Sequence, residues 1–157
     1  MALISALTAV ATSIGHTGGG HERGSMSTSS VRASADREMA TMARNIDRTS
    51  VGDTRVASFL ASEFGMSEEA MLTEKRTLRA SWGNLTIAHT LAAGDGSGMA
   101  AAQVLQLHDR GMGWGQVAVG LRLKLEDALR AVKAESRVAM GRAKADGHVA
   151  PIGADGF

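Results

Sequence analysis

Apolar residues recur at helical spacing along most of this chain. In the segment from Val31 they lie three or four residues apart, with arginine and aspartate between them. This pattern predicts one amphipathic helix that ends near Arg48. The same spacing predicts six further helices, over residues 53–64, 67–79, 84–93, 99–110, 116–121 and from 125 to about 140. The chain is therefore predicted to be all-α.

Two terminal segments lack this periodicity. Residues 1–30 join an apolar stretch, Met1–Ile14, to an arm of Gly, Ser, Thr and His, and such an arm has little to bury. Residues 146–157 form a tail that we expect to be mobile. The sequence thus predicts a flexible N-terminal arm (1–30), one small multi-helix domain (31–145) and a flexible tail (146–157).

The apolar stretch Met1–Ile14 has two interpretations. It carries an Ala9-Val10-Ala11 triplet, which is typical of signal-peptidase sites, but it lacks the positive charge at the start of a signal peptide. It is either the remnant of an export signal or a short amphipathic or core helix. Because it is too short to span a bilayer, we expect no membrane span. The stretch favours a periplasmic or extracellular protein and leaves the cytoplasm open.

A ten-residue pattern occurs twice, 32 residues apart. WGNLTIAHTL starts at Trp82 and WGQVAVGLRL at Trp114, so Trp, Gly, an amide side chain and an aliphatic residue recur in order. Each copy follows one helical segment and precedes another, which predicts two repeated helix-corner-helix units. The residues expected to build these corners are Trp82, Gly83, Asn84, Gly113, Trp114, Gly115 and Gln116.

Each residue type in the corner has a physical role. Glycine allows a sharp turn, and the side chain of Asn84 or Gln116 can accept from free amides at the start of the next helix. An indole ring fills the junction between two helices. We therefore expect both tryptophans to be wedges in the core, in preference to a surface role in stacking or ligand binding.

The second corner resembles a known motif. GMGWGQVA, from Gly111 to Ala118, is similar to Gly-x-Gly-Trp-Gly-x-Ile-Ala, which recurs in uncharacterised, often exported bacterial proteins with a preceding Trp-Gly unit. The similarity covers roughly residues 59–133 and implies a bacterial protein of a kind that is often exported, but no activity, substrate or cofactor. Where that family has Leu-Gly after the short helix, this chain has Leu121-Arg122, which puts a glycine-dependent turn there in question.

Composition argues against several kinds of chemistry. The chain has no cysteine, and its formal charge of +1 is far from the surplus of a non-specific nucleic-acid binder. Its five histidines are scattered, and no P-loop, dinucleotide fingerprint or Gly-x-Ser-x-Gly motif occurs. We expect no enzyme, no cofactor and no metal site.

The favoured hypothesis is a protein-interaction or structural component of a bacterial assembly. Nine methionines are many for this length, and their flexible side chains suit adaptable docking surfaces. Met39, Met42 and Ile46 on the first helix form the candidate surface. The expected partner is another protein or a second copy of the chain.

The alternative is a helix-turn-helix-like DNA-binding regulator. The apolar spacing from Val104 to Val132 resembles a helix-turn-helix of the resolvase type, in which the start of the last helix enters the major groove. Two carboxylates, Glu126 and Asp127, would meet phosphate oxygens there. Nucleic acid is therefore the less favoured partner. Its candidate contacts are Lys124, Arg130, Lys133 and Arg137.

Overall fold

The computed structural model of this chain describes residues 27–49, 52–145, 147 and 153. Within these residues, 75% of positions are helical and no strand is present. The seven helices of this part are α1 (Thr28–Thr49), α2 (Asp53–Phe64), α3 (Glu68–Leu78), α4 (Trp82–Gly94), α5 (Ala101–Asp109), α6 (Trp114–Gly120) and α7 (Leu125–Ala139). The prediction of an all-α fold is confirmed. Residues 1–26 and most of the tail, with the export signal and the mobile segments predicted there, lie outside the described residues.

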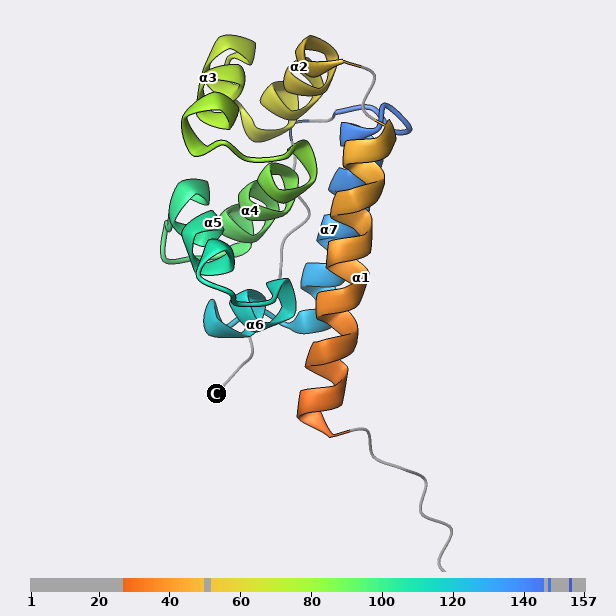
Figure 1. Cartoon of the computed structure of the whole chain (residues 1–157), viewed down its shortest axis with the longest axis vertical. Helices are drawn as coiled ribbons and strands as arrows, with labels where there is room; N and C mark the ends of the chain where they lie inside the picture. The colour runs from red at the N-terminus through yellow and green to blue at the C-terminus, as the bar shows by residue number, and fades with distance from the viewer. Residues whose placement is uncertain (1–26, 50–51, 146, 148–152, 154–157) are drawn as a thin grey trace, which may run out of the picture.

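Helix α4 lies at the centre of the fold. Eight of its 13 residues are buried, as is typical of a helix enclosed by its neighbours. Helices α1, α5 and α7 pack around it (Figure 1). Thr86 and Thr90 are also fully buried, and each donates its hydroxyl to a carbonyl oxygen one turn earlier at 2.7 Å. Their polar atoms are therefore satisfied inside the helix.

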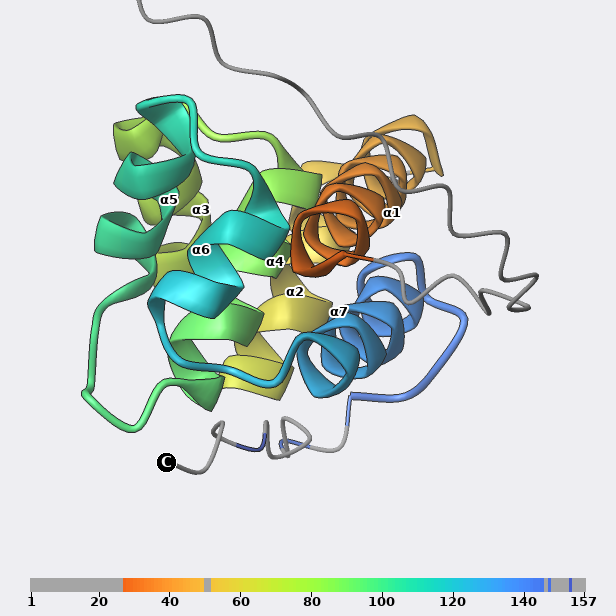
Figure 2. The ribbon, with the colours of Figure 1, turned by 90° about the horizontal axis from the view of Figure 1, so that it is seen from below.

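Helices α1 and α7 lie side by side and run in the same direction (Figures 1 and 2). Each turns its apolar stripe toward α4, and these stripes include small buried side chains such as Ala43 of α1 and Ala131 of α7. Helices α2 and α3 cover one end of this arrangement, and α6 covers the other. None of the described helices is long and apolar enough for a bilayer crossing.

Helices α4 and α6 each begin two residues earlier than the sequence indicates. Trp82 and Trp114 are the first residues of these helices, whereas starts at Asn84 and Gln116 were expected. The Trp-Gly pair therefore forms the first helical turn, because the amides of that turn have acceptors elsewhere in the fold. Two helix-corner-helix units are present, and the corner itself precedes each tryptophan.

The turn after α6 forms without glycine. Arg122 has a φ of 58°, in the left-handed region that costs a residue with a side chain about 1 kcal/mol. The family that the motif resembles has glycine there. The chain thus keeps the turn between α6 and α7 at a small cost in stability.

Candidate functional site

The Trp-Gly pair of α4 is seated on α1. The backbone N–H of Gly83 donates to Oδ1 of Asp47 at 2.8 Å. A Cβ atom on Gly83 would lie 2.2 Å from the carbonyl oxygen of Ala43, so only glycine lets the two helices approach this closely.

The Trp-Gly pair of α6 is seated on α1 in the same way. The N–H groups of Gly115 and Gln116 donate to Oδ1 of Asp36 at 2.5 and 3.3 Å. A Cβ on Gly115 would lie 2.9 Å from the carbonyl oxygen of Arg32, and one on Gly113 would lie 2.4 Å from the Asp36 carboxylate. Helix α1 therefore supplies one carboxylate to the positive N-terminal end of each Trp-Gly helix.

Both indole rings are buried, with 3% of Trp82 and 1% of Trp114 exposed. Nε1 of Trp82 donates to Oδ1 of Asp53 at 2.7 Å, and Lys75 Nζ lies 5.1 Å from the centre of the Trp82 ring. The Trp114 ring stacks on His108, with the ring centres 4.0 Å apart. Trp82 thereby joins α2 and α3 to α4, and Trp114 joins α5 to α6.

The amide side chains of the two corners do not cap these helices. Oγ of Ser81 accepts the N–H of Asn84 at 3.2 Å, and Asp36 accepts that of Gln116. The prediction that the Asn84 or Gln116 side chain satisfies the free amides is therefore wrong. Sequence reasoning missed Asp36 and Asp47. In the sequence, the two aspartates are eleven residues apart, which is about three helical turns and places both on one face of α1. This spacing was the sign that could have identified them.

The predicted interaction surface on α1 is wrong for two of its three residues. Met39 and Ile46 are both 0% exposed, because the apolar stripe of α1 faces the core instead of solvent. Met39 packs in the cluster around Trp114, and Ile46 in the cluster around Trp82. Met42 is partly exposed at the edge of the first cluster.

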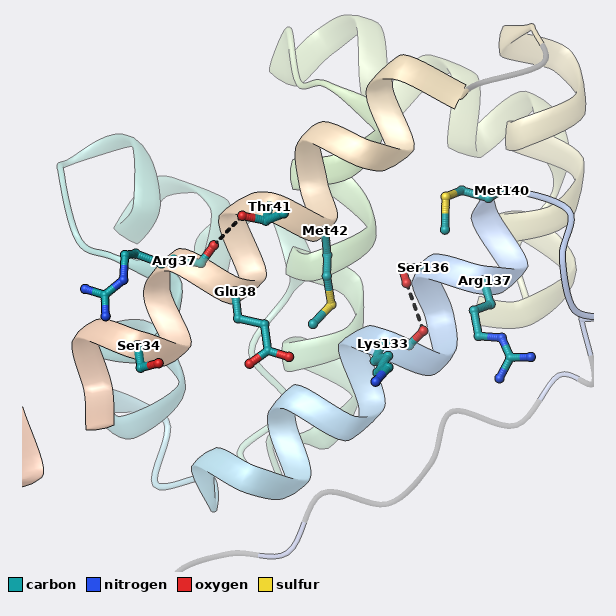
Figure 3. A pocket seen from close by; sticks show the side chains of 9 residues that line it. All are labelled: Ser34, Arg37, Glu38, Thr41, Met42, Lys133, Ser136, Arg137 and Met140. Carbon is teal, nitrogen blue, oxygen red and sulfur yellow. Dashed lines mark hydrogen bonds between the residues drawn. The ribbon is translucent and has the colours of Figure 1, made fainter. Parts of the chain in front are cut away.

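Met42 lies in a groove of about 550 Å³ between α1 and α7 (Figure 3). Met42 of α1 and Met140, the residue that follows α7, supply its apolar surface. The hydroxyls of Thr41 and Ser136, which also line the groove, each donate at 2.8 Å to a carbonyl oxygen of their own helix. The polar atoms left to meet a ligand are therefore mainly those of charged side chains.

The charged side chains around this groove are mostly basic. Arg37 of α1 and Lys133 and Arg137 of α7 line it, together with one carboxylate, Glu38 (Figure 3). Within the described residues, none of these three cations has an ion-pair partner. Their positive charge is thus available to a ligand.

The basic lining extends past Met140. A hollow of about 290 Å³ shares Met140 with the groove and is lined by Arg48 and Arg142. These two side chains also have no ion-pair partner in the described part of the chain. We use the name basic groove for both hollows together.

The structure separates the four predicted nucleic-acid contacts. Lys133 and Arg137 line the basic groove. Arg130 pairs with Asp127 at 2.7 Å, and Lys124 lies at the start of α7. The first turn of α1 lines a hollow together with this end of α7, so α7 does not project from the fold as a recognition helix does.

A separate hollow, of about 790 Å³, holds an imidazole and a carboxylate. Nε2 of His89 donates to Oε2 of Glu74 at 2.8 Å, and the imidazole stacks on Phe64 with ring centres 4.9 Å apart. These contacts tie α2 and α3 to α4. Among the residues that the structure describes, no three His, Asp or Glu side chains lie close enough together to hold a metal ion.

No family model, curated protein or solved structure matches the chain. The resemblance of residues 111–118 to uncharacterised bacterial proteins therefore stays a prediction from that motif. On the described surface, the basic groove combines basic side chains without ion-pair partners and two partly exposed methionines.

Proposed function

We propose that this protein is a non-catalytic interaction module that binds an acidic segment of a partner protein in the basic groove between α1 and α7. The observation that carries this proposal is a set of cations without ion-pair partners, in the described residues, around two partly exposed methionines. Export of the protein and a place in a bacterial assembly stay predictions from the sequence.

The chemistry of the basic groove fits an amphipathic acidic segment. Five basic side chains and one acidic side chain, Glu38, line the basic groove, so carboxylates are the complementary groups and gain from charge-assisted hydrogen bonds. Met42 and Met140 offer flexible apolar surface that adapts to aliphatic anchors. A helix that carries acidic residues on one side and aliphatic residues on the other supplies both.

DNA is the second candidate, and the groove favours it less. A phosphate backbone would use the cations of the groove, but it offers nothing apolar to Met42 and Met140. The predicted entry point for the major groove, at the start of α7, is occupied by Glu126 and by the Arg130–Asp127 ion pair. Carboxylates at that position repel phosphate oxygens.

The test is a selection of ligands on the full chain. Random 16-residue peptides displayed on phage are selected on the wild-type protein and counter-selected on the double variant Lys133→Glu/Arg137→Glu. We expect enriched peptides to combine acidic and aliphatic residues. Their affinity should fall at least about tenfold in the double variant, which corresponds to about 1.4 kcal/mol, and should weaken as salt is raised.

The matched control is Arg130→Glu, which reverses a charge on the same helix outside the basic groove. It should leave peptide affinity within about twofold, since Arg130 is already paired with Asp127. Peptides that bind the double variant as well as the wild type would contradict the proposal. Salt-sensitive binding of a 20-base-pair DNA duplex that is lost in the double variant, without acidic peptides, would establish the DNA alternative instead.

A further inference from the structure

The tail that follows α7 is hydrogen-bonded to the helical domain at two glycines. The backbone N–H of Gly147 donates to Oε2 of Glu63 in α2 at 3.3 Å. The carbonyl oxygen of Gly153 accepts the N–H of Lys124, the residue before α7, at 2.8 Å. The sequence predicts a mobile tail over residues 146–157, yet both of these described positions in it are tied to helices.

Gly153 lies at the edge of a hollow of about 420 Å³. Lys124 and Asp127 line this hollow, and both are close to Gly153. A Cβ atom on Gly153 would lie 2.8 Å from Oδ2 of Asp127 and 3.3 Å from Cδ of Lys124. The lack of a side chain therefore lets the tail approach the start of α7 closely. The residues after Gly153 leave from the rim of the hollow.

This hollow has an aliphatic surface. Among the described residues, Val31 and Val119 are the exposed large hydrophobic side chains, at 39% and 37% exposure. Both line the hollow together with Leu125, and we use the name end hollow for it. Figure 2 looks onto this end of the molecule, where α6 lies beside the starts of α1 and α7. Exposed aliphatic residues that gather in one hollow mark a place where another apolar group can bind.

We propose that the end hollow binds residues 154–157 of this chain, with the phenyl ring of Phe157 packed on the three aliphatic side chains. These four residues, Ala-Asp-Gly-Phe, lie outside the described residues, and their reach follows from Gly153. Four residues span up to about 13 Å when extended, which exceeds the width of a compact hollow of about 420 Å³. Phe157 is the large hydrophobic residue among the four, and Gly156 before it allows the backbone to turn inward.

Charge at the rim of the end hollow favours the same segment. Asp127 is paired with Arg130, whereas Lys124 has no ion-pair partner within the described residues. Nζ of Lys124 lies 3.7 Å from the place that a Cβ on Gly153 would take. Asp155 is two positions after Gly153 and therefore lies on the same side of an extended chain. Its carboxylate is the complementary group for the Lys124 ammonium.

The test is NMR spectroscopy of the isotope-labelled full chain. Nuclear Overhauser effects should join the ring protons of Phe157 to the methyl groups of Val31 and Val119. The backbone order parameters of residues 155–157 should be about 0.85, as in a rigid segment. Phe157→Leu keeps an apolar side chain but removes the ring current, so it should shift the methyl resonances of Val31 and Val119 and leave the rest of the spectrum unchanged.

Val119→Glu breaks the contact from the side of the end hollow. It places a charge among aliphatic side chains at a position that is already exposed. The contacts of Phe157 should disappear, and the order parameters of residues 155–157 should fall below about 0.6. Gln116→Glu is the matched control, since it adds the same charge to an exposed position of α6 that does not line the end hollow. It should behave like wild type.

Three results would overturn the proposal. The first is a wild-type chain in which residues 155–157 have order parameters below about 0.6 and Phe157 has no contact with the end hollow. The second is a set of contacts to the end hollow from residues 1–26 instead. The third is contact between labelled and unlabelled copies in a mixed sample, because the occupant is then a second chain. Phe157→Leu keeps the test valid if Val119→Glu does not fold, since that change leaves the helices untouched.

Discussion

The Trp82 and Trp114 corners share a sequence pattern and a seat on α1, yet they are held by different sets of contacts. At the first corner, Ser81 and Asp47 divide the free amides of α4 between them. At the second, the N-cap is Gly113, and Asp36 accepts from two amides of α6. Among the described residues, no other side chain caps that helix.

The indoles differ in a similar way. Trp82 is fixed by a hydrogen bond from its N–H to Asp53. Trp114 is fixed by stacking on His108, whose Nδ1 donates to the carbonyl oxygen of Met112 at 2.9 Å. The shared Trp-Gly motif allows the close approach of the helices. The residues outside the motif determine which further contacts hold each tryptophan in place. Since α1 is one wall of the basic groove, both corners also set the shape of that groove.

The largest difference should appear when a methyl group is added to each glycine. Gly83→Ala places a Cβ against the backbone of Ala43, so a whole helix must shift, and we expect a loss of roughly 3 kcal/mol in the free energy of unfolding. Gly115→Ala makes a milder contact, at 2.9 Å from the carbonyl oxygen of Arg32, and should cost about 1–2 kcal/mol. Urea unfolding measures both. An equal or larger loss in Gly115→Ala would contradict this order.

Removal of the α1 carboxylates should have the next largest effect. Asp36→Ala leaves two amides of α6 without their acceptor and should cost about 2 kcal/mol, whereas Asp47→Ala leaves one and should cost about 1 kcal/mol. Thermal unfolding of both variants tests the order. Asp36→Asn is the control, because it keeps an acceptor oxygen and should recover part of the loss. If Asp47→Ala proved the more damaging change, the second corner would not depend on Asp36 as described.

The smallest effect concerns acid and arises at the first corner. The hydrogen bond from the Trp82 indole, aided by Lys75, lowers the pKa of Asp53 below its ordinary value. A lowered pKa in the folded state adds stability above the pKa of the unfolded chain, and this stability is lost as pH falls through the folded pKa. As the pH is lowered from 5 to 2.5, the free energy of unfolding of the wild type should therefore fall slightly more than that of Asp53→Asn, whose side chain does not titrate. Identical pH profiles would exclude this contribution. The effect is small because the Asp53 side chain is 63% exposed.

The sequence predicts the helices and the repeat because both depend on local spacing. The spacing from Val31 onward identifies an amphipathic helix, but it does not say whether Met39 and Ile46 face the core or a partner. That depends on α4 and α7, which complete the core around them. The motif likewise shows two Trp-Gly pairs, but not the acceptors of their amides. Asp36 lies 79 residues from Gly115 in sequence, so the contact exists only after the chain has folded.

The sequence indicates some residues of the basic groove, but it does not place them in one site. Met42 was predicted as part of an interaction surface, and Lys133 and Arg137 as nucleic-acid contacts, because nothing in the sequence places α1 beside α7. Their approach brings the three residues into one hollow. Arg130, another member of the predicted nucleic-acid set, is paired with Asp127 and does not line the groove. The sequence already permits this pair, because the two residues are three positions apart on a helix.

The central claim is that α1 holds both corners through Asp36 and Asp47, and amide hydrogen exchange tests it most directly. In the wild-type protein, the amides of Gly83 and Gly115 should both be protected. Asp36→Ala should speed exchange at Gly115 by about tenfold or more while Gly83 stays protected, and Asp47→Ala should do the reverse. Rapid exchange of both amides in wild type, or no response of Gly115 to Asp36→Ala, would contradict the account.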